Sequence, residues 1–551
     1  MFSLFRAECE KICGEYSKYL ESPKSDIADL ALPCFHIAKS TGKNPVEIAR
    51  SLEREFGKKK KTFIAEVKAL GPYVNFYINE KKFSHAVVKE LLKITPCKKT
   101  GKNIMVEYSS PNSNKPLHIG HLRNDCIGMS ISNILEAKGN NVIRANIVND
   151  RGVHICKTLV AYQKLNKIKN PDKKGDHFVG DLYVAFEKAS KENPQLTEDA
   201  YDKLKKWEAG DKDTRALWLK LRKFVLDGFH ETYDRFGSKF DVWFFESEFY
   251  NKAAPLIEEG MKLGVFEKNE KGDIIAKLEP EMPNKTFLRS DGTSIYATND
   301  LALTKHKFDK YKLNKSIWVV ASEQNLYFKQ LFKVFEKLRY DWHHNCYHLS
   351  YGLVNLPSGR MKSREGTVVD ADDIMNEMQE LAKKEISSRE KENKISKKEL
   401  EERSMAIALS AIKYFMLKVE PSKDILFNPE DAISFEGDTG PYIQYTYARA
   451  KSILNKSKKK PLAGELGQKE KDAVILLSKF PDIVEQAEEQ MSPHVIAVYL
   501  HELAAKFNTY YHDSHVIGDK NEQALLAFVT ATANVLKKGM ELLGIQPIEK
   551  M

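Results

Sequence analysis

The sequence lacks the features that mark several large classes of protein. Its seven cysteines are scattered and form no CxxC pair, so neither a disulfide framework nor a cysteine-based zinc site is expected. No apolar run is long enough to cross a bilayer, and no secretory leader is recognisable. These absences predict a cytoplasmic protein with reduced thiols and no membrane partner.

The sequence also contains no internal repeat and no dense cluster of carboxylates, so no resident metal site is expected. A chain of 551 residues with 42% hydrophobic content predicts about three domains. Its formal net charge of +10 permits an anionic partner such as a nucleic acid. A modest positive balance also serves simple solubility, so charge alone does not decide.

The strongest local signal is a polar stretch between an apolar run and a helical pattern. Residues 109–121, SSPNSNKPLHIGH, follow IMVEY and precede LRNDCIGMSISNILE. A strand that turns into a helix leaves unpaired N–H groups and a positive dipole end, where phosphates bind. We expect His118 and His121 to share a face of the first helical turn and to donate to one oxyanion, while Gly120 lets a purine ring approach the backbone. The alternative is a helix start with two satisfied histidines.

A second basic segment, GRMKSREGTVVDADD, lies far downstream at 359–373. A HIGH sequence followed by a KMSKS-like loop is similar to the class I aminoacyl-tRNA synthetases, and the surrounding residues resemble arginyl-tRNA synthetase in particular. The resemblance covers nearly the whole chain. It includes LRSDGTSIYATNDLAL at 288–303, VVASEQNLYF at 319–328, GPYIQYTYARAKSIL at 440–454 and the C-terminal GIQPIEKM.

Hydrophobic patterning predicts an α/β fold in three parts. Residues 1–95 form a small α/β domain, and residues 102–373 a doubly wound parallel, Rossmann-like catalytic domain with a helical insertion at about 160–235. Residues 374–551 are expected to form an all-α helical bundle. The resemblance implies that the first domain binds the tRNA elbow, or D-loop, and that the bundle binds the anticodon. The individual segments expected in the first domain are helices near 3–20, 45–56 and 81–94 and the strands TFIAEV and YVNFYI.

The resemblance implies that L-arginine is activated with ATP and then transferred to the terminal adenosine of tRNA(Arg). It assigns catalysis to His118, His121 and Lys115, with Lys115 replacing a lysine that the KMSKS-like loop lacks. The alternative for Lys115 is a surface lysine beside Pro116. The register of the loop is ambiguous. The expected ATP contacts are Gly120, His118, His121, Met361, Lys362, Ser363 and Arg364.

A guanidinium is a planar cation that a carboxylate holds best in a bidentate pair. Asp300 is the candidate, since it lies four residues after Tyr296 and would share its helix face. It could instead cap the following helix. The resemblance places five further residues on arginine, with Glu107, Asn149 and Asp150 in support and the role of His154 left open. These five are Ser110, Asn112, His118, Tyr296 and Gln324.

Recognition of tRNA is expected at both ends of the chain. Tyr442, Tyr445 and Arg449 recur at helical spacing and offer two rings and a planar cation to unpaired bases. An aromatic stripe buried in a helical core is the alternative. The resemblance adds Tyr511 and Met551, for which a frayed terminus is the cautious expectation. In the first domain it adds Tyr73 and Asn75.

The remaining expectations concern partners and competing functions. Mg²⁺ is expected only as a companion of ATP, and the protein is expected to be a monomer without a separate editing domain. One competing function is another nucleotidyl-transferring enzyme that uses HxGH. The other is a catalytically inactive descendant of a synthetase that binds tRNA or arginine.

Overall fold

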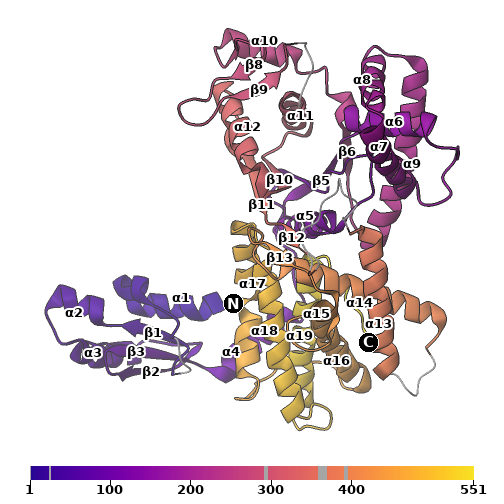
Figure 1. The fold of residues 1–551 in the computed structure, drawn as a ribbon. Coiled ribbons are helices and arrows are strands. Elements are labelled where there is room, and N and C mark those ends of the chain that lie inside the picture. Colours follow the sequence, from indigo (N-terminus) through magenta and orange to yellow (C-terminus); the bar gives the residue numbers. More distant parts are fainter. Residues whose placement is uncertain (1, 24–26, 291–295, 356, 358–368, 390–394) are drawn as a thin grey trace.

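The computed structural model describes residues 2–23, 27–290, 296–355, 357, 369–389 and 395–551. Figure 1 shows three parts: the N-terminal domain at the left, a helical bundle in the lower half and the catalytic domain above it. Among the described residues, no helix combines the length and apolar character needed to cross a membrane.

The N-terminal domain is an antiparallel sheet with helices packed on it. The predicted strands are present, and the helix expected near 3–20 divides into an α-helix and a 3₁₀ segment at Gly14, whose φ of +58° suits glycine. The first strand in the chain was not predicted. The sheet order is β1-β3-β2, and the elements are α1 (Phe2–Cys13), η1 (Gly14–Tyr19), β1 (Leu30–Pro33), α2 (Phe35–Thr41), α3 (Pro45–Gly57), β2 (Ile64–Leu70) and β3 (Tyr73–Ile78).

Helix α4 (Glu80–Leu91) fastens this domain to the C-terminal bundle. It packs against α17 (Lys471–Glu489) and α19 (Glu522–Leu542). The Ser84 hydroxyl accepts a hydrogen bond from the Leu466 amide (3.2 Å), and the Asn534 amide donates to the carbonyl of Leu91 (2.9 Å). The N-terminal domain is therefore held by the bundle (Figure 1).

The catalytic domain is built on a five-stranded, all-parallel sheet with the order β11-β10-β4-β5-β6. The chain starts at the central strand, proceeds to one edge and then returns to the other side, so the winding reverses at β4. In such sheets ligands bind beyond the carboxyl ends of the strands, near the reversal. The predicted doubly wound fold is confirmed. Its strands are β4 (Asn103–Glu107), β5 (Asn141–Val148), β6 (Val242–Phe245), β10 (Lys315–Ala321) and β11 (Cys346–Tyr351).

Helix α5 (Ile119–Ala137) lies at the centre of the molecule and is buried along almost its whole length. A Cβ on Gly128 would come within 2.2 Å of the Tyr108 ring, so glycine allows the helix to lie directly on the sheet. The other side of α5 packs against α14 (Lys397–Leu417) and α19. It thus joins the sheet to the bundle.

Arg123 reinforces this junction from inside α5. Its side chain is fully buried, and its guanidinium donates to four backbone carbonyls at 2.6–3.2 Å. These carbonyls belong to two segments that follow β11 and α14, namely Gly352, Leu353, Pro421 and Lys423. One side chain therefore ties together three distant parts of the chain.

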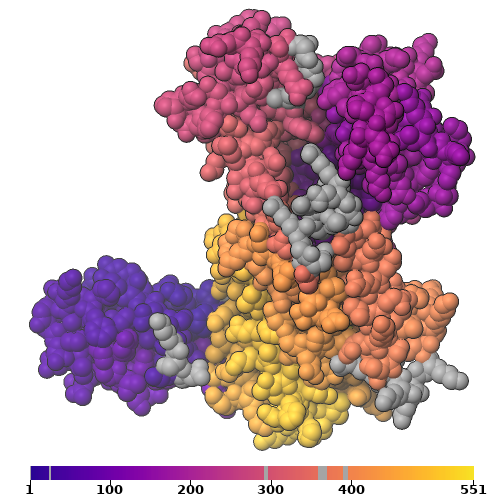
Figure 2. Space-filling model, in the orientation of Figure 1, coloured from indigo at the N-terminus to yellow at the C-terminus, as the bar shows by residue number. Residues whose placement is uncertain are grey.

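Two lobes rise from the sheet, and Figure 2 shows a hollow between them. One is the helical insertion, which begins somewhat earlier than expected: α6 (Val153–Lys164), α7 (Gly175–Glu192), α8 (Gln195–Glu208) and α9 (Lys212–Phe236). The other contains an antiparallel sheet that was not predicted. Its elements are α10 (Ala254–Lys262), β7 (Phe266–Lys268), β8 (Ile274–Ala276), β9 (Lys285–Leu288), α11 (Tyr296–Tyr311) and α12 (Asn325–Lys337).

The C-terminal part is the predicted helical bundle. A two-residue strand, β13 (Ile425–Leu426), pairs in parallel with β12 (Val354–Asn355) and links the bundle to the catalytic domain. The remaining helices are α13 (Ala371–Arg389), α15 (Pro429–Ile433), α16 (Gly440–Lys456) and α18 (His494–Asp513).

Candidate functional site

The two signature histidines form the N-terminal cap of α5. His118 is the cap residue, with extended backbone, and its Nδ1 accepts a hydrogen bond from the Gly120 amide (3.1 Å). The Nδ1 of His121 in turn accepts from the His118 amide (3.1 Å). His118 thus precedes the first helical turn, although we had expected it within that turn. The two histidines form a capping box, and their ring centroids lie 3.9 Å apart.

This capping determines the state of both imidazoles. Because each Nδ1 accepts a backbone hydrogen bond, each ring carries its proton on Nε2, where it can serve as a donor. Burial, with a smaller contribution from Lys115, lowers the pKa of His118 to about 3. Burial likewise lowers the pKa of His121 well below its usual value. Both rings are therefore neutral donors near pH 7.

Gly120 has a tighter role than the sequence suggested. A Cβ at this position would lie 3.0 Å from two atoms of the His118 ring. A side chain here would require the ring to shift by a few tenths of an ångström from its capping position. Glycine therefore protects the imidazole pair, whatever it also offers to a nucleotide.

The end of the second basic segment, residues 369–373, lies beside the start of α5. His118 and Asp370 form an isolated antiparallel bridge, flanked by hydrogen bonds from the Ile119 amide to Val369 (3.1 Å) and from the Ala371 amide to Leu117 (3.0 Å). The bridge places the start of α13 beside the start of α5. The predicted ATP contacts Met361, Lys362, Ser363 and Arg364 lie outside the described residues.

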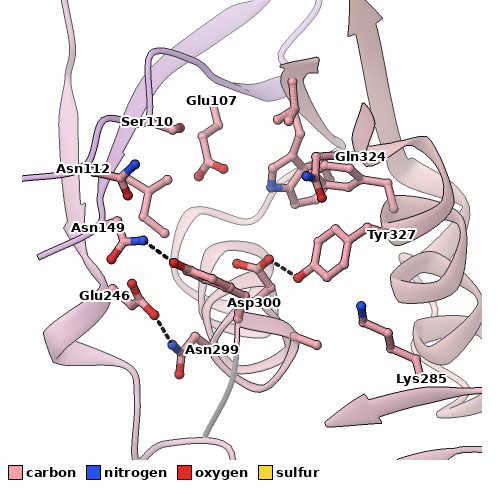
Figure 3. A pocket seen from close by; sticks show the side chains of 16 residues that line it. Glu107, Ser110, Asn112, Asn149, Glu246, Lys285, Asn299, Asp300, Gln324 and Tyr327 are labelled. Atoms are coloured by element: carbon pink, nitrogen blue, oxygen red, sulfur yellow. Dashed lines mark hydrogen bonds between the residues drawn. The ribbon is translucent and has the colours of Figure 1, made fainter. Parts of the chain in front are cut away.

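A cavity of about 470 Å³ opens at the carboxyl ends of the strands (Figure 3). Five of the predicted arginine contacts line it, from the turn after β4, the 3₁₀ turn η3 (Ser322–Gln324) after β10, and α11, whereas His118 does not. The polar and charged side chains in its lining include those of Glu107, Ser110, Asn112, Asn149, Glu246, Lys285, Tyr296, Asn299, Asp300, Gln324 and Tyr327.

The turn that leads from β4 into this cavity has unusual backbone geometry. Ser109 and Ser110 have φ angles of 70° and 51°, in the left-handed region that non-glycine residues rarely adopt. Asn124 accepts a hydrogen bond from the Ser109 amide (2.7 Å), and Asn146 accepts one from the Ser110 amide (3.2 Å). These two asparagines hold the turn that brings Ser110 to the cavity wall.

Asp300 lies inside α11 and does not cap it, so the capping alternative is wrong. Its side chain faces the cavity together with Tyr296, as the four-residue spacing predicted, and Tyr296 stands at the mouth, 57% exposed. The hydroxyl of Tyr327 donates to Asp300 Oδ2. Burial raises the pKa of Asp300 to about 6, while this hydrogen bond opposes the rise.

Glu246 is a second acid in the cavity that the sequence analysis missed. It follows β6 in a 3₁₀ turn, η2 (Glu246–Glu248), and its Oε1 accepts a hydrogen bond from the Asn299 amide (2.7 Å). Burial raises its pKa to about 8, and the nearby Asp300 adds to the rise. No local pattern in FFESEF marks this residue, because only the pairing of β6 with β5 brings it here.

Glu107 ends β4 at the cavity and is paired with Lys307 of α11. Both side chains are buried, and the ammonium lies over the rings of Phe244 (5.4 Å) and Trp318 (5.3 Å). The described lining of the cavity thus contains three acidic side chains, Glu107, Asp300 and Glu246, against the ammonium of Lys285 and the Lys307 partner of Glu107. It is built to receive positive charge.

The supporting residues expected near the cavity divide into two groups. The side-chain amide of Asn149 is hydrogen-bonded to the Tyr296 hydroxyl (2.9 Å), so it belongs to the cavity wall. Asp150 instead points away and pairs with Arg222 (3.0 Å) and the Ser247 hydroxyl (2.8 Å). Its role is to hold the turn after β6.

Lys115 and His118 line a second cavity of about 270 Å³, bounded by α7 and the start of α13. Lys115 is partly buried and its pKa is lowered by that burial, which disfavours the surface-lysine alternative. His154 is also near, since burial and Lys115 lower its pKa to about 4. An ammonium and a neutral imidazole therefore face the same region.

One acidic group could be considered for a metal. His177, Asp370 and Asp372 bring their ligand atoms within 4.8 Å of one another. However, the ammonium of Lys174 already lies 2.7 Å from Asp372 Oδ2, and the nearby carboxylates of Asp372 and Asp370 raise the pKa of His177. The group is therefore a compensated ion network that joins α7 to α13.

Three of the residues predicted to bind the anticodon lie on α16 (Tyr442, Tyr445 and Arg449), and Tyr511 lies on α18. The Arg449 guanidinium lies 4.6 Å from the ring centroids of both Tyr445 and Tyr511 and donates to Asn508 (2.6 Å). Tyr445 and Tyr511 are partly exposed, which opposes the buried-stripe alternative for them. Tyr442 packs near His501.

The other three residues predicted to bind tRNA, Met551, Tyr73 and Asn75, differ in exposure and in packing. Met551 packs against a small apolar cluster that includes Tyr445, so the terminus is held in place. Tyr73 is partly exposed and lies edge-on to the exposed Phe35 (5.6 Å). Asn75 is only 3% exposed, which leaves Tyr73 as the accessible member of the predicted pair.

Comparison with known proteins identifies this architecture. Residues 83–428 match the family model of tRNA synthetases class I (R), catalytic domain, so the parallel sheet with its imidazole-capped helix is that of a class I aminoacyl-tRNA synthetase. Residues 3–78 match the arginyl tRNA synthetase N terminal domain, and residues 443–551 match the DALR anticodon binding domain. The chain belongs to the arginyl-tRNA synthetase family.

Individual relatives match most or nearly all of the chain. The chain is 41% identical to the arginine–tRNA ligase of Treponema denticola over 98% of this chain and 96% of that protein, and 42% identical to that of Bacteroides fragilis over 81% and 80%. Among solved structures it resembles the arginyl-tRNA synthetase of Thermus thermophilus, with a TM-score of 0.81 and 26% identity over 99% of this chain and all of that one.

Proposed function

We propose that this protein is an arginine–tRNA ligase, which activates L-arginine with ATP and transfers it to the terminal adenosine of tRNA(Arg). The observation that carries the proposal is the acidic cavity at the strand ends, where Asp300 and Glu246 face a space of about 470 Å³ beside the turn to the imidazole-capped helix. Family membership supplies the reaction class.

Arginine enters this cavity with two cationic groups and one carboxylate. Its guanidinium faces Asp300, because a planar fork of donors is best met by a carboxylate. Glu246 lies beside it, and a bound cation lowers the raised pKa of this acid so that it too can ionise. Glu107, at the opposite wall in Figure 3, is positioned for the α-ammonium group. Ser110, Asn112 and Gln324 complete the wall with neutral polar groups.

In the activation step an oxygen of the arginine carboxylate attacks the α-phosphorus of ATP, and pyrophosphate leaves. Negative charge grows on phosphoryl oxygens, so fixed donors supply the acceleration. The Nε2 protons of His118 and His121 and the ammonium of Lys115 are these donors. Mg²⁺ enters with ATP and neutralises phosphate charge, and no resident metal is proposed.

In the transfer step the 2′-hydroxyl of the terminal adenosine attacks the carbonyl carbon of arginyl-adenylate, and AMP leaves. The proposal gives the protein a positioning role here and no covalent intermediate. Arg449, Tyr445 and Tyr511 hold unpaired anticodon bases, and Tyr73 contacts the D-loop corner of tRNA. The protein acts as a monomer in the cytoplasm, where its free cysteines stay reduced.

The test is arginine-dependent exchange of labelled pyrophosphate into ATP, with and without tRNA(Arg). Exchange is expected with arginine and only when tRNA is present. Lysine and citrulline should give rates lower by about 10⁴-fold, because each leaves buried polar groups unpaired. Exchange with a different amino acid would overturn the specificity, and no exchange under any condition would overturn the enzymatic proposal.

A further inference from the structure

Asp300 is held from the side by a neighbour that belongs to another helix. Tyr327 lies on α12, and its hydroxyl donates to Asp300 Oδ2, as the dashed line in Figure 3 shows. This bond occupies one acceptor site of one oxygen and fixes the plane of the carboxylate. The other oxygen remains available to a ligand in the cavity.

The Tyr327 ring has a second contact that bears on the same carboxylate. The ammonium of Lys285, which also lines the cavity, lies 5.2 Å from the centroid of this ring. A cation over an aromatic face is stabilised there. The Lys285 ammonium is therefore stabilised by the Tyr327 ring instead of by an ion pair with Asp300. The Asp300 carboxylate can then bind the cation of a ligand.

We propose that Tyr327 is a positioning residue for substrate specificity, which orients the Asp300 carboxylate toward the guanidinium and keeps it ionised in a buried site. The inference rests on the proposed function, because it assumes that arginine fills the cavity. It adds a residue of the cavity wall whose hydroxyl donates to Asp300 and which acts on arginine through the orientation and charge of that acid.

The environment of Asp300 gives this role a measurable signature. The carboxylate is buried, its pKa is already raised to about 6, and the Tyr327 hydrogen bond favours its charged form. Removal of that bond should raise the pKa further, so that more of the acid is protonated and unable to pair with a guanidinium. The other titratable groups that face Asp300 are Glu107, Glu246, Tyr296 and Lys307.

The decisive variant is Tyr327→Phe, which removes the hydroxyl but keeps the ring and its contact with Lys285. In pyrophosphate exchange with tRNA present, KM for arginine should rise roughly 10-fold at pH 7.5, as expected for loss of a hydrogen bond to a charged group, while kcat changes less than about twofold. The ratio of variant to wild-type KM should widen as the pH falls from 8.5 to 6.

The matched control is Tyr340→Phe. Tyr340 is a tyrosine near the end of α12 whose buried hydroxyl has no hydrogen-bond partner among the described residues. Its KM for arginine and pH profile should equal those of the wild type. Thermal unfolding of both variants shows whether each remains folded.

The outcomes separate the two proposals. If wild-type protein shows no arginine-dependent exchange, the proposed function fails and this inference falls with it. If the wild type is active but folded Tyr327→Phe keeps the wild-type KM, the inference alone is overturned. A KM that rises by the same factor at every pH would also overturn it, because that result indicates a change of shape without a change in Asp300 ionisation.

Discussion

The backbone of His118 pairs with that of Asp370, so the first residue of the α5 cap and the last residue before α13 form one antiparallel bridge. These residues lie far apart in the chain. Their pairing joins the segments that carry the two sequence signatures, and it makes the position of the capping imidazole depend on α13 as well as on α5.

Replacement of Asp300 by asparagine should raise KM for arginine roughly 100-fold, because a buried guanidinium loses its charged partner. The fold should persist, since an amide keeps the size of the side chain. Asp309→Asn, on the same helix and exposed, is the control and should leave KM unchanged. Steady-state pyrophosphate exchange measures both. A normal KM in Asp300→Asn would remove this acid from the arginine site.

The pH dependence of turnover should show no contribution from the signature histidines between pH 5.5 and 8. The pKa of His118 is lowered to about 3, so the folded protein keeps this ring neutral throughout that range. At saturating arginine, kcat should therefore lack an acid limb that belongs to an imidazole. A limb near pH 6.5 that disappears in His118→Asn would contradict the neutral-donor assignment.

The same lowered pKa has a consequence for stability. In the unfolded chain His118 becomes protonated below about pH 6.5, whereas in the folded protein it stays neutral until about pH 3. The free energy of unfolding should therefore fall as the pH is lowered from about 6.5 to about 3. His118→Asn should weaken that decline. Urea unfolding at pH 7.5 and at pH 5 measures how much the free energy of unfolding changes in each protein. An equal change in the wild type and in His118→Asn would contradict a buried, neutral His118.

Arg449→Met should weaken binding of tRNA(Arg) about 10-fold, since the guanidinium between Tyr445 and Tyr511 organises the stacking face. KM for arginine should be unaffected. Lys456→Met lies on the same helix at an exposed site and provides the control. Filter binding at fixed salt distinguishes them, and equal losses in both variants would indicate a general effect of charge on affinity.

Arg123→Met should lower the free energy of unfolding by about 3 to 5 kcal/mol, because four buried carbonyls lose a charged donor. Arg6→Met removes a half-exposed pair with Glu10 and should cost less than about 1 kcal/mol. Urea unfolding followed by tryptophan fluorescence compares them. Similar losses would show that Arg123 does not hold the three segments together.

Sequence patterning predicted the elements whose hydrophobic period is undisturbed. The strand NVIRANIV coincides with β5 because it pairs with strands on both sides, which favours the β-branched residues it contains. Strand β1 was missed because LALP is short and ends in proline, and its pairing with β3 comes from a distant part of the chain. The small sheet β7-β8-β9 was missed because each of its strands is only three or four residues long, too short to show a period.

In the candidate site, too, only the contacts set by local sequence spacing could be predicted. Asp300 and Tyr296 could be placed together because helical spacing is a local property. Glu246 and Tyr327 could not, since their approach to Asp300 depends on the strand order and on the packing of α12 against α11. His118 was placed on the right helix but inside its first turn, because sequence alone does not reveal that a histidine caps its own helix.

The attachment of the N-terminal domain through α4 to α17 and α19 sets a fixed distance between two surfaces proposed to touch RNA. Because the two surfaces keep a fixed separation, an RNA that contacted both would be selected by its overall dimensions as well as by its bases. Loosening α4 would then relax discrimination by size while each contact surface stayed intact.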